Sequence, residues 1–184
     1  MKFQKYFESV EKIYHASSKE LTRNRSAKKN EIAYYEEKGG HKFGSNIGSA
    51  WMICNGTNQK SSIFTRPGYL TGFYLLSIEA SIKERSLMKK RAEGYKNYVE
   101  PNKRNPKISG SWYEEGWIPF GALNGGSSLL ICDMSPADRG STGQIICYTH
   151  DPDEIVYIAK DFSSYLKASL KSFKEDKQEF LGIY

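Results

Sequence analysis

Apolar side chains recur every three or four positions near the start of the chain, between residues 3 and 14, with lysine and glutamate between them. This spacing predicts an amphipathic helix with one face on the core. Residues 17–30 are basic and have no apolar period, so we expect a mobile or weakly helical connector. Two short helices follow, over 31–38 and 45–54, and each ends where glycine interrupts the pattern.

The pattern then changes to short apolar runs that are typical of strands. Residues 62–65 form the first run, which ends in a turn at Arg66-Pro67-Gly68, and residues 69–78 form a longer run rich in aromatic side chains. A helix with many basic side chains is predicted from 79 to about 99. Two prolines and the absence of any period make residues 100–110 a loop.

The second half of the chain carries the strongest strand signal. Turn-forming residues separate four apolar runs, at 117–121, 128–133, 144–149 and 154–159. Asn124-Gly125-Gly126 is a hairpin signal, because asparagine and glycine adopt the positive φ of tight turns. A last helix is predicted from Phe162. We therefore predict a single α+β domain over residues 1–184, in which an antiparallel meander is flanked by N-terminal and C-terminal helices.

Composition narrows the class of protein. The chain has 184 residues, 39% of them hydrophobic and 26% charged, which is typical of a globular domain. No apolar run reaches the ~18 residues that span a bilayer, and charges interrupt the N-terminus, so we expect no membrane partner, no signal peptide and a cytoplasmic location. Three cysteines without a CxxC pair predict buried free thiols: Cys54, Cys132 and Cys147.

Charge is unevenly distributed along the chain. Residues 1–110 hold 21 of the 27 Lys and Arg but 10 of the 21 Asp and Glu, so the first part is basic and the rest is acidic. The segment 83–107 has nine basic and three acidic residues, and Tyr95 and Tyr98 could stack on bases. Nucleic-acid binding by this segment is one hypothesis. A solvated basic helix face is favoured over it, because no RNP, KH or helix-turn-helix signature accompanies the charge.

Catalytic and metal-binding patterns are lacking in the sequence. It contains no P-loop, HExxH or GxSxG motif, and the three histidines, His15, His41 and His150, are scattered. We therefore predict no cofactor, no metal and no enzymatic activity. The acidic residues near the strand ends fall in turns, where aspartate bonds to backbone amides. An enzyme that uses Asp133, Asp138 and His150 stays open as an alternative, and it requires these three side chains to converge.

The run 116–166 resembles the SMI1/KNR4 (SUKH) superfamily, with weaker agreement over 30–170. The match begins with Gly116-Trp117-Ile118-Pro119-Phe120-Gly121 and ends with a helix that starts near Phe162. The aromatic residues of the motif supply apolar area, the glycines allow turns, and the aspartate at a strand end can bond turn amides. These roles are structural. The signature residues are Trp117, Pro119, Phe120, Gly125, Gly126, Asp133, Gly143 and Gln144.

The resemblance implies a function through protein partners. Bacterial members are mostly immunity proteins that bind and neutralise a cognate polymorphic toxin without catalysis, and the fungal relatives are cell-wall-synthesis regulators. Immunity proteins against nucleases are typically acidic, whereas this chain is basic. Either the toxin is not a nuclease, or the acidic second half makes the contact. We expect the cognate toxin protein to bind the exposed face and loops of the sheet at Glu114, Glu115, Asp138, Arg139, Tyr148 and Asp151.

Overall fold

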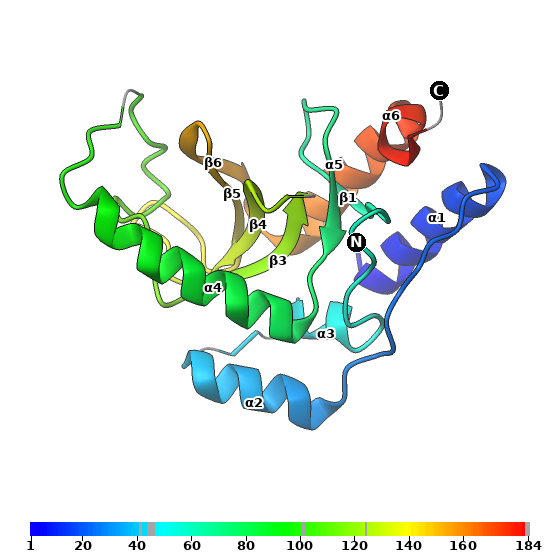
Figure 1. Cartoon of the computed structure of the whole chain (residues 1–184), viewed down its shortest axis with the longest axis horizontal. Helices are drawn as coiled ribbons and strands as arrows, with labels where there is room; N and C mark the ends of the chain where they lie inside the picture. The colour runs from blue at the N-terminus through cyan, green and yellow to red at the C-terminus, as the bar shows by residue number, and fades with distance from the viewer. Residues whose placement is uncertain (41, 44–46, 101, 124, 183–184) are drawn as a thin grey trace.

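Figure 1 shows the computed structural model of the chain, which describes residues 1–40, 42–43, 47–100, 102–123 and 125–182. His41, Asn124 and the first residues of the predicted 45–54 helix lie outside these ranges. The strands are β1 (Phe64–Thr65), β2 (Gly72–Leu75), β3 (Trp117–Leu123), β4 (Ser128–Asp133), β5 (Gln144–His150) and β6 (Asp153–Ala159). The helices are α1 (Phe3–Ala16), α2 (Lys29–Gly39), α3 (Ile47–Trp51), α4 (Ile78–Ala92), the 3₁₀ turn η1 (Glu93–Tyr95), α5 (Phe162–Glu175) and α6 (Lys177–Leu181).

The strands form one antiparallel sheet in the order in which they occur in the chain, β1-β2-β3-β4-β5-β6. The predicted meander and the α+β class are therefore confirmed. Between β3 and β4 the backbone turns with positive φ at Gly125 (91°) and Gly126 (73°), a region that glycine adopts without steric cost. β4 and β5 pair with Ser128 opposite Thr149 and with Asp133 opposite Gln144.

Both faces of the sheet are covered. All six residues of β4 are buried, as are six of seven in β3 and five of seven in β5. Phe120 and Leu130 pack with residues of α1, α3 and α5, whereas Trp117 and Ile131 pack with residues of α4 and of segment 96–112. We call segment 96–112 the strap, and the two faces the aromatic side and the strap side. In the part of the chain that the structure describes, β3, β4 and β5 present no exposed face of the kind that we expected to bind a partner, whereas β6 is only partly buried.

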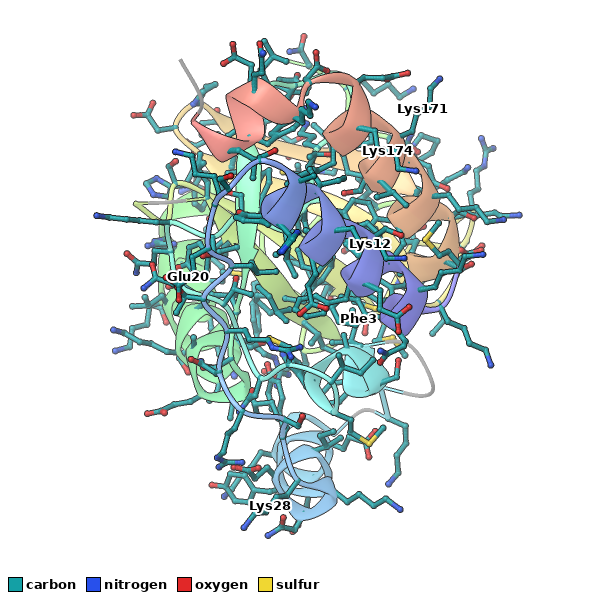
Figure 2. The ribbon with its side chains drawn as sticks, turned by 90° about the vertical axis from the view of Figure 1, so that its right-hand side faces the viewer. Phe3, Lys12, Glu20, Lys28, Lys171 and Lys174 are labelled. Atoms are coloured by element: carbon teal, nitrogen blue, oxygen red, sulfur yellow. The ribbon has the colours of Figure 1, made fainter. Side chains whose placement is uncertain are left out.

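Edge-to-face ring contacts and satisfied hydroxyls hold the aromatic side together. The ring centroid of Phe120 lies 5.3 Å from that of Phe64 and 5.4 Å from that of Phe162. α1 lies beside α5, as Figure 2 shows. The Tyr6 hydroxyl from α1 lies 2.8 Å from Oγ of Ser169 in α5. Through these contacts, two helices far apart in sequence form one cover over β1 and the sheet centre.

The strap is held to α4 and the sheet by aromatic and arginine side chains. The ring of Trp112 stacks on Tyr95 with centroids 4.1 Å apart, and the Arg104 guanidinium lies 4.9 Å from the Trp112 ring. Arg104 also donates a 2.6 Å hydrogen bond to the Ser109 carbonyl. The predicted loop at 100–110 belongs to this strap, and the helix predicted to continue to 99 ends at Ala92 before η1.

The connector at 17–30 is the clearest correction to the predicted elements. Residues 19–28 form no helix, and residues 29–30 belong to α2. The segment is bonded to the end of α3 and the chain after it, since the Asn24 amide donates to the Gly56 carbonyl at 2.9 Å and the Ala27 amide donates to the Trp51 carbonyl at 2.8 Å. Figure 2 shows this segment running between Glu20 and Lys28. Backbone pairing with a distant segment leaves no apolar period in the sequence, so the pattern alone did not reveal it.

Other differences are smaller. The first half of the predicted 69–78 strand belongs to the β1–β2 hairpin loop, and α6 follows α5 without having been predicted. All three cysteines are free and buried, as expected. None of the helices in the described part of the chain is long and apolar enough to cross a membrane.

Candidate partner-binding site

The structure divides the predicted contact residues between two opposite ends of the sheet. Glu114 and Glu115 precede β3, and Asp138 and Arg139 lie in the β4–β5 turn at the same end. Asp151 lies in the β5–β6 turn at the other end. β5 has seven residues, so the two ends are separated by about 20 Å at roughly 3.3 Å per residue. These residues therefore do not form one small site.

Tyr148 is not available to a partner. Its side chain is 1% exposed and packs on the strap side with Trp112, at 6.1 Å between ring centroids. β5 directs Tyr148 to the same side of the sheet as Ile146, under α4 and the strap. The sequence pattern placed Tyr148 on an exposed face that does not exist. Tyr148 is therefore withdrawn as a contact residue.

Glu114 and Glu115 already have partners within the fold. The Glu115 carboxylate lies 2.6 Å from Lys89 Nζ and 2.9 Å from Arg85 Nη2, and it accepts the Tyr113 hydroxyl at 2.8 Å. The hydrogen bonds from Lys89 and Tyr113 hold the pKa of Glu115 below its usual range. Glu114 accepts a hydrogen bond from the Ser109 hydroxyl. Both carboxylates therefore tie the chain before β3 to its neighbours, Glu115 to α4 and Glu114 to the strap.

The signature residues form a structural network at this end of the sheet. Asp133 is fully buried and accepts the Gln144 side-chain amide at 2.8 Å and the Ser135 backbone amide at 3.0 Å. Gln144 also donates to the Lys107 carbonyl at 2.8 Å, which joins the strap to the sheet. Burial raises the pKa of Asp133, while the bonds from Gln144 and Ser135 oppose the rise. The Gly143 amide donates to the Asp133 carbonyl at 2.7 Å.

The remaining signature residues also have structural places. Trp117 and Phe120 are fully buried on opposite sides of the sheet, and the Pro119 carbonyl accepts the Ser81 hydroxyl from α4. Gly125 and Gly126 make the turn between β3 and β4. The signature residues therefore have roles in building the sheet, and they do not identify a partner-binding surface.

The alternative of a small enzyme loses its geometric basis. Asp133 pairs with the first residue of β5, whereas His150 is the last residue of that strand. About 20 Å therefore separates them, and they do not converge with Asp138. Within the described residues, no group of three or more His, Cys, Asp or Glu side chains could hold a metal ion.

Four of the nine basic side chains in segment 83–107 make contacts within the fold. Arg85 and Lys89 pair with Glu115, and Arg104 pairs with Glu100. Lys107 lies 4.4 Å from the Tyr157 ring centroid. Tyr95, one of the two tyrosines considered for base stacking, is already stacked on Trp112. These contacts favour a structural role for the segment over nucleic-acid binding.

The end of the sheet that holds Asp151 contains a cleft of about 460 Å³. The β1–β2 hairpin loop, the β3–β4 turn and the β5–β6 turn surround it, along the upper edge of the molecule in Figure 1. We call it the rim cleft. The lining residues used below are Arg66, Tyr69, Phe73, Thr149, Asp151 and Glu154.

Curling of the sheet makes the rim cleft. Arg66 follows β1 at one edge of the sheet, and its Nη2 lies 3.5 Å from Oε2 of Glu154 in β6 at the other edge. This ion pair links residues from the two edges of the curved sheet in Figure 1. On the outer side, the Tyr95 hydroxyl donates to Asp153 at the start of β6. Burial and this carboxylate raise the pKa of Tyr95.

Exposed apolar side chains lie on two segments that line the rim cleft. Tyr69 (50% exposed) and Leu70 (61%) are in the β1–β2 hairpin loop, and Tyr98 (39%) and Val99 (86%) are in the strap just before Asn102, which also lines the cleft. The sequence analysis identified Arg66-Pro67-Gly68 only as a turn, considered Tyr98 only for base stacking, and did not identify Tyr69, Leu70 or Val99. The available signal was the pair Tyr69-Leu70, two large apolar residues directly after a Pro-Gly turn.

A comparison with curated proteins finds no match to this chain. A protein-family model does match, over residues 26–168, and its description is the SMI1 / KNR4 family (SUKH-1). The matched part includes α2, α3, α4, all six strands and the first half of α5, and α1 precedes it. Since the match covers most of the chain and the observed fold agrees with the resemblance noted in the sequence, this protein belongs to the SMI1/KNR4 (SUKH-1) family.

Proposed function

We propose that this protein is an immunity protein, which binds a cognate toxin domain in the cytoplasm of the cell that makes it and blocks the toxin by occlusion without catalysis. The SUKH family is associated with immunity proteins, which supports a role in binding a protein partner. The separation of Asp133 from His150 removes the enzyme considered above. We further propose that the whole chain, 1–184, acts as one binding unit.

The observation that carries the proposal is the rim cleft with its exposed apolar border. Helices and the strap cover both sheet faces, so a partner must bind at an end of the sheet or on the outer surface of the helices. Partner-binding surfaces typically combine aromatic or aliphatic anchors with a polar rim. Tyr69, Leu70 and Asp151 provide both at the rim cleft.

The charge of the cleft agrees with a basic partner surface. Three acidic residues and one arginine line it, namely Asp151, Asp153, Glu154 and Arg66. The acidic part of the sequence thus contributes to this end of the fold, although the whole chain has a net charge of +6. Complementary charge speeds the encounter of two proteins and selects among partners. A regulator that acts through other protein partners would use the same surface.

Binding to the captured partner tests the proposal. The tagged protein is incubated with nuclease-treated lysate of the cells that produce it, and a captured polypeptide is then purified, assayed for toxicity and titrated against variants. We expect Leu70→Asp and Asp151→Lys to weaken binding about tenfold or more, and to abolish protection when both are combined. Asp138→Lys, at the opposite end of the sheet, is the matched control and should bind as the parent does.

Two results would contradict the proposal. If Asp138→Lys weakens binding while Leu70→Asp does not, the partner uses the other end of the sheet. If species are captured from untreated lysate but none from nuclease-treated lysate, the chain binds nucleic acid, and affinity should then fall steeply with salt.

A further inference from the structure

Arg66 lies at the rim cleft with much of its hydrogen-bonding capacity unused. Its side chain is only 10% exposed, and its one polar contact within the described residues is the ion pair with Glu154. At 3.5 Å this contact is longer than a charge-assisted hydrogen bond of about 2.7–2.9 Å. A guanidinium offers five N–H donors, and a buried charge without full pairing is unfavourable. The cleft therefore opens onto a largely buried guanidinium whose one ion pair is long, so that its other N–H groups can bind a ligand that enters the cleft.

The position of the Arg66 guanidinium is fixed before any ligand arrives. Its Cζ lies 3.7 Å from the centroid of the Tyr69 ring, so the two planar groups stack. The preceding residue, Thr65, is fully buried, and its amide donates to Oγ of Ser169 at 2.9 Å. Phe73, 1% exposed, packs within the same wall of the cleft. A recognition group that is already ordered loses little entropy on binding.

The surrounding charges define which anion can reach Arg66. Asp151 is exposed on the turn, and the Glu154 side chain is 47% exposed. Asp153, which accepts the Tyr95 hydroxyl, also lines the cleft, so three carboxylates place negative charge near its opening. A phosphate with two charges would be repelled more strongly than a carboxylate with one. A carboxylate matches the fork of a guanidinium, and a neighbouring cation would offset the repulsion by facing Asp151.

We propose that Arg66 is the recognition residue of the rim cleft and that it binds a carboxylate flanked by a cationic group, such as an acidic side chain next to a basic one on a loop of the partner. That the partner is a toxin rests on the proposed function. The chemistry of recognition does not, because small probes can test it without any toxin.

Blocked dipeptides provide these probes. Aspartyl-arginine, asparaginyl-arginine and aspartyl-alanine, each acetylated and amidated, are titrated into the isotope-labelled full-length protein while the Arg66 side-chain Nε–H and the Thr149 amide are followed by NMR. We expect aspartyl-arginine to bind with a dissociation constant in the millimolar range. The dissociation constant of the asparaginyl probe should be at least about tenfold higher, because this probe loses the charge-assisted bonds to Arg66.

Variants separate recognition by Arg66 from a purely structural role. Arg66→Gln should abolish the preference for aspartyl over asparaginyl probes. Glu154→Gln should strengthen binding of both aspartyl probes severalfold, because it removes the competing carboxylate and keeps Arg66. Asp151→Asn should remove the preference for aspartyl-arginine over aspartyl-alanine. Asp138→Asn, far from the cleft, is the control and should change nothing.

The outcomes overturn or support the inference independently of the toxin. If the aspartyl and asparaginyl probes bind the parent protein equally, or if neither shifts the cleft resonances at tens of millimolar, Arg66 does not recognise a carboxylate. Should Arg66→Gln fail to fold, the parent protein and Glu154→Gln still decide the question with the same three probes. If the protein binds the carboxylate probes but no toxin partner is found, this inference is supported and only the proposed function is contradicted.

Discussion

The two sides of the sheet share the same strands but are stabilised differently. On the aromatic side, buried hydroxyls have partners: Tyr14 donates to the Ser62 carbonyl at 2.8 Å, and Tyr165 donates to the Thr65 carbonyl at 3.0 Å. Tyr6 contacts both the Ile63 carbonyl and Ser169. Each of these groups is thus satisfied while its ring adds to the apolar core.

The strap side carries the unsatisfied polar atoms. Within the described residues, five buried side-chain atoms have no hydrogen-bond partner, and all of them belong to α4, the strap or the strand residues beneath them. They are Arg85 Nε, Arg91 Nη1, Arg104 Nε, Trp117 Nε1 and Tyr148 Oη. A buried donor without an acceptor costs free energy, so this side should be the less stable of the two.

The two covers of the sheet therefore have separate roles. α1 and α5 close a core that holds the sheet in its curled form, and that curl brings β1 and β6 together at the rim cleft. The strap side contributes the network of Asp133, Gln144 and Lys107 at the opposite end. Stability of the aromatic side and shape of the binding cleft are therefore coupled, and the following predictions test the comparison.

The largest expected effect is truncation on the aromatic side. Phe120→Ala removes a fully buried ring that contacts Phe64 and Phe162, and we expect the free energy of unfolding to fall by about 3–5 kcal/mol in urea titrations. Phe120→Leu, which keeps most of the volume, should lose less than about 1.5 kcal/mol. A loss below about 1 kcal/mol for the alanine variant would show that this side is loosely packed.

Removing single hydroxyls compares the two sides directly. Tyr6→Phe removes the hydroxyl bonded to the Ile63 carbonyl and to Ser169, which keeps its hydrogen bond from the Thr65 amide, and should destabilise the protein by about 1–3 kcal/mol. The Tyr148 hydroxyl makes no hydrogen bond of ordinary geometry and interacts only electrostatically with Tyr95 and Arg91, so Tyr148→Phe should cost less than Tyr6→Phe. Thermal and urea unfolding of both variants measure this. Equal losses would mean that the two sides do not differ as described.

The smallest effect is a pH dependence on the strap side. Burial raises the pKa of Asp133 in the folded protein above its unfolded value, so its contribution to stability is fully present below the unfolded pKa, near 4, and is lost as pH rises through the folded pKa. The stability of the parent protein relative to Asp133→Asn should therefore decrease from pH 4 toward pH 7. A difference that increases over this range would show that Gln144 and Ser135 outweigh burial.

The sequence alone was sufficient to predict those elements whose signal lies in neighbouring residues. The helical period of Phe3 to Tyr14, the apolar runs of β3 to β6 and the glycines at Gly125-Gly126 each follow from side-chain spacing or backbone freedom, so the meander and its flanking helices were predicted correctly. The family signature was also readable, because Trp117, Asp133 and Gln144 serve the fold itself.

Which surfaces are accessible to a partner depends on how the helices and the strap pack on the sheet, and this follows from the tertiary structure alone. A strand with both faces buried appears in the sequence as an apolar run, and such a run does not show what covers each face. For this reason Tyr148 was predicted to be exposed, whereas the structure buries it. The pairing of connector 17–30 with the chain after α3 and the approach of Arg66 to Glu154 join segments far apart in sequence. Such contacts depend on the curl of the sheet and leave no periodic trace in the chain.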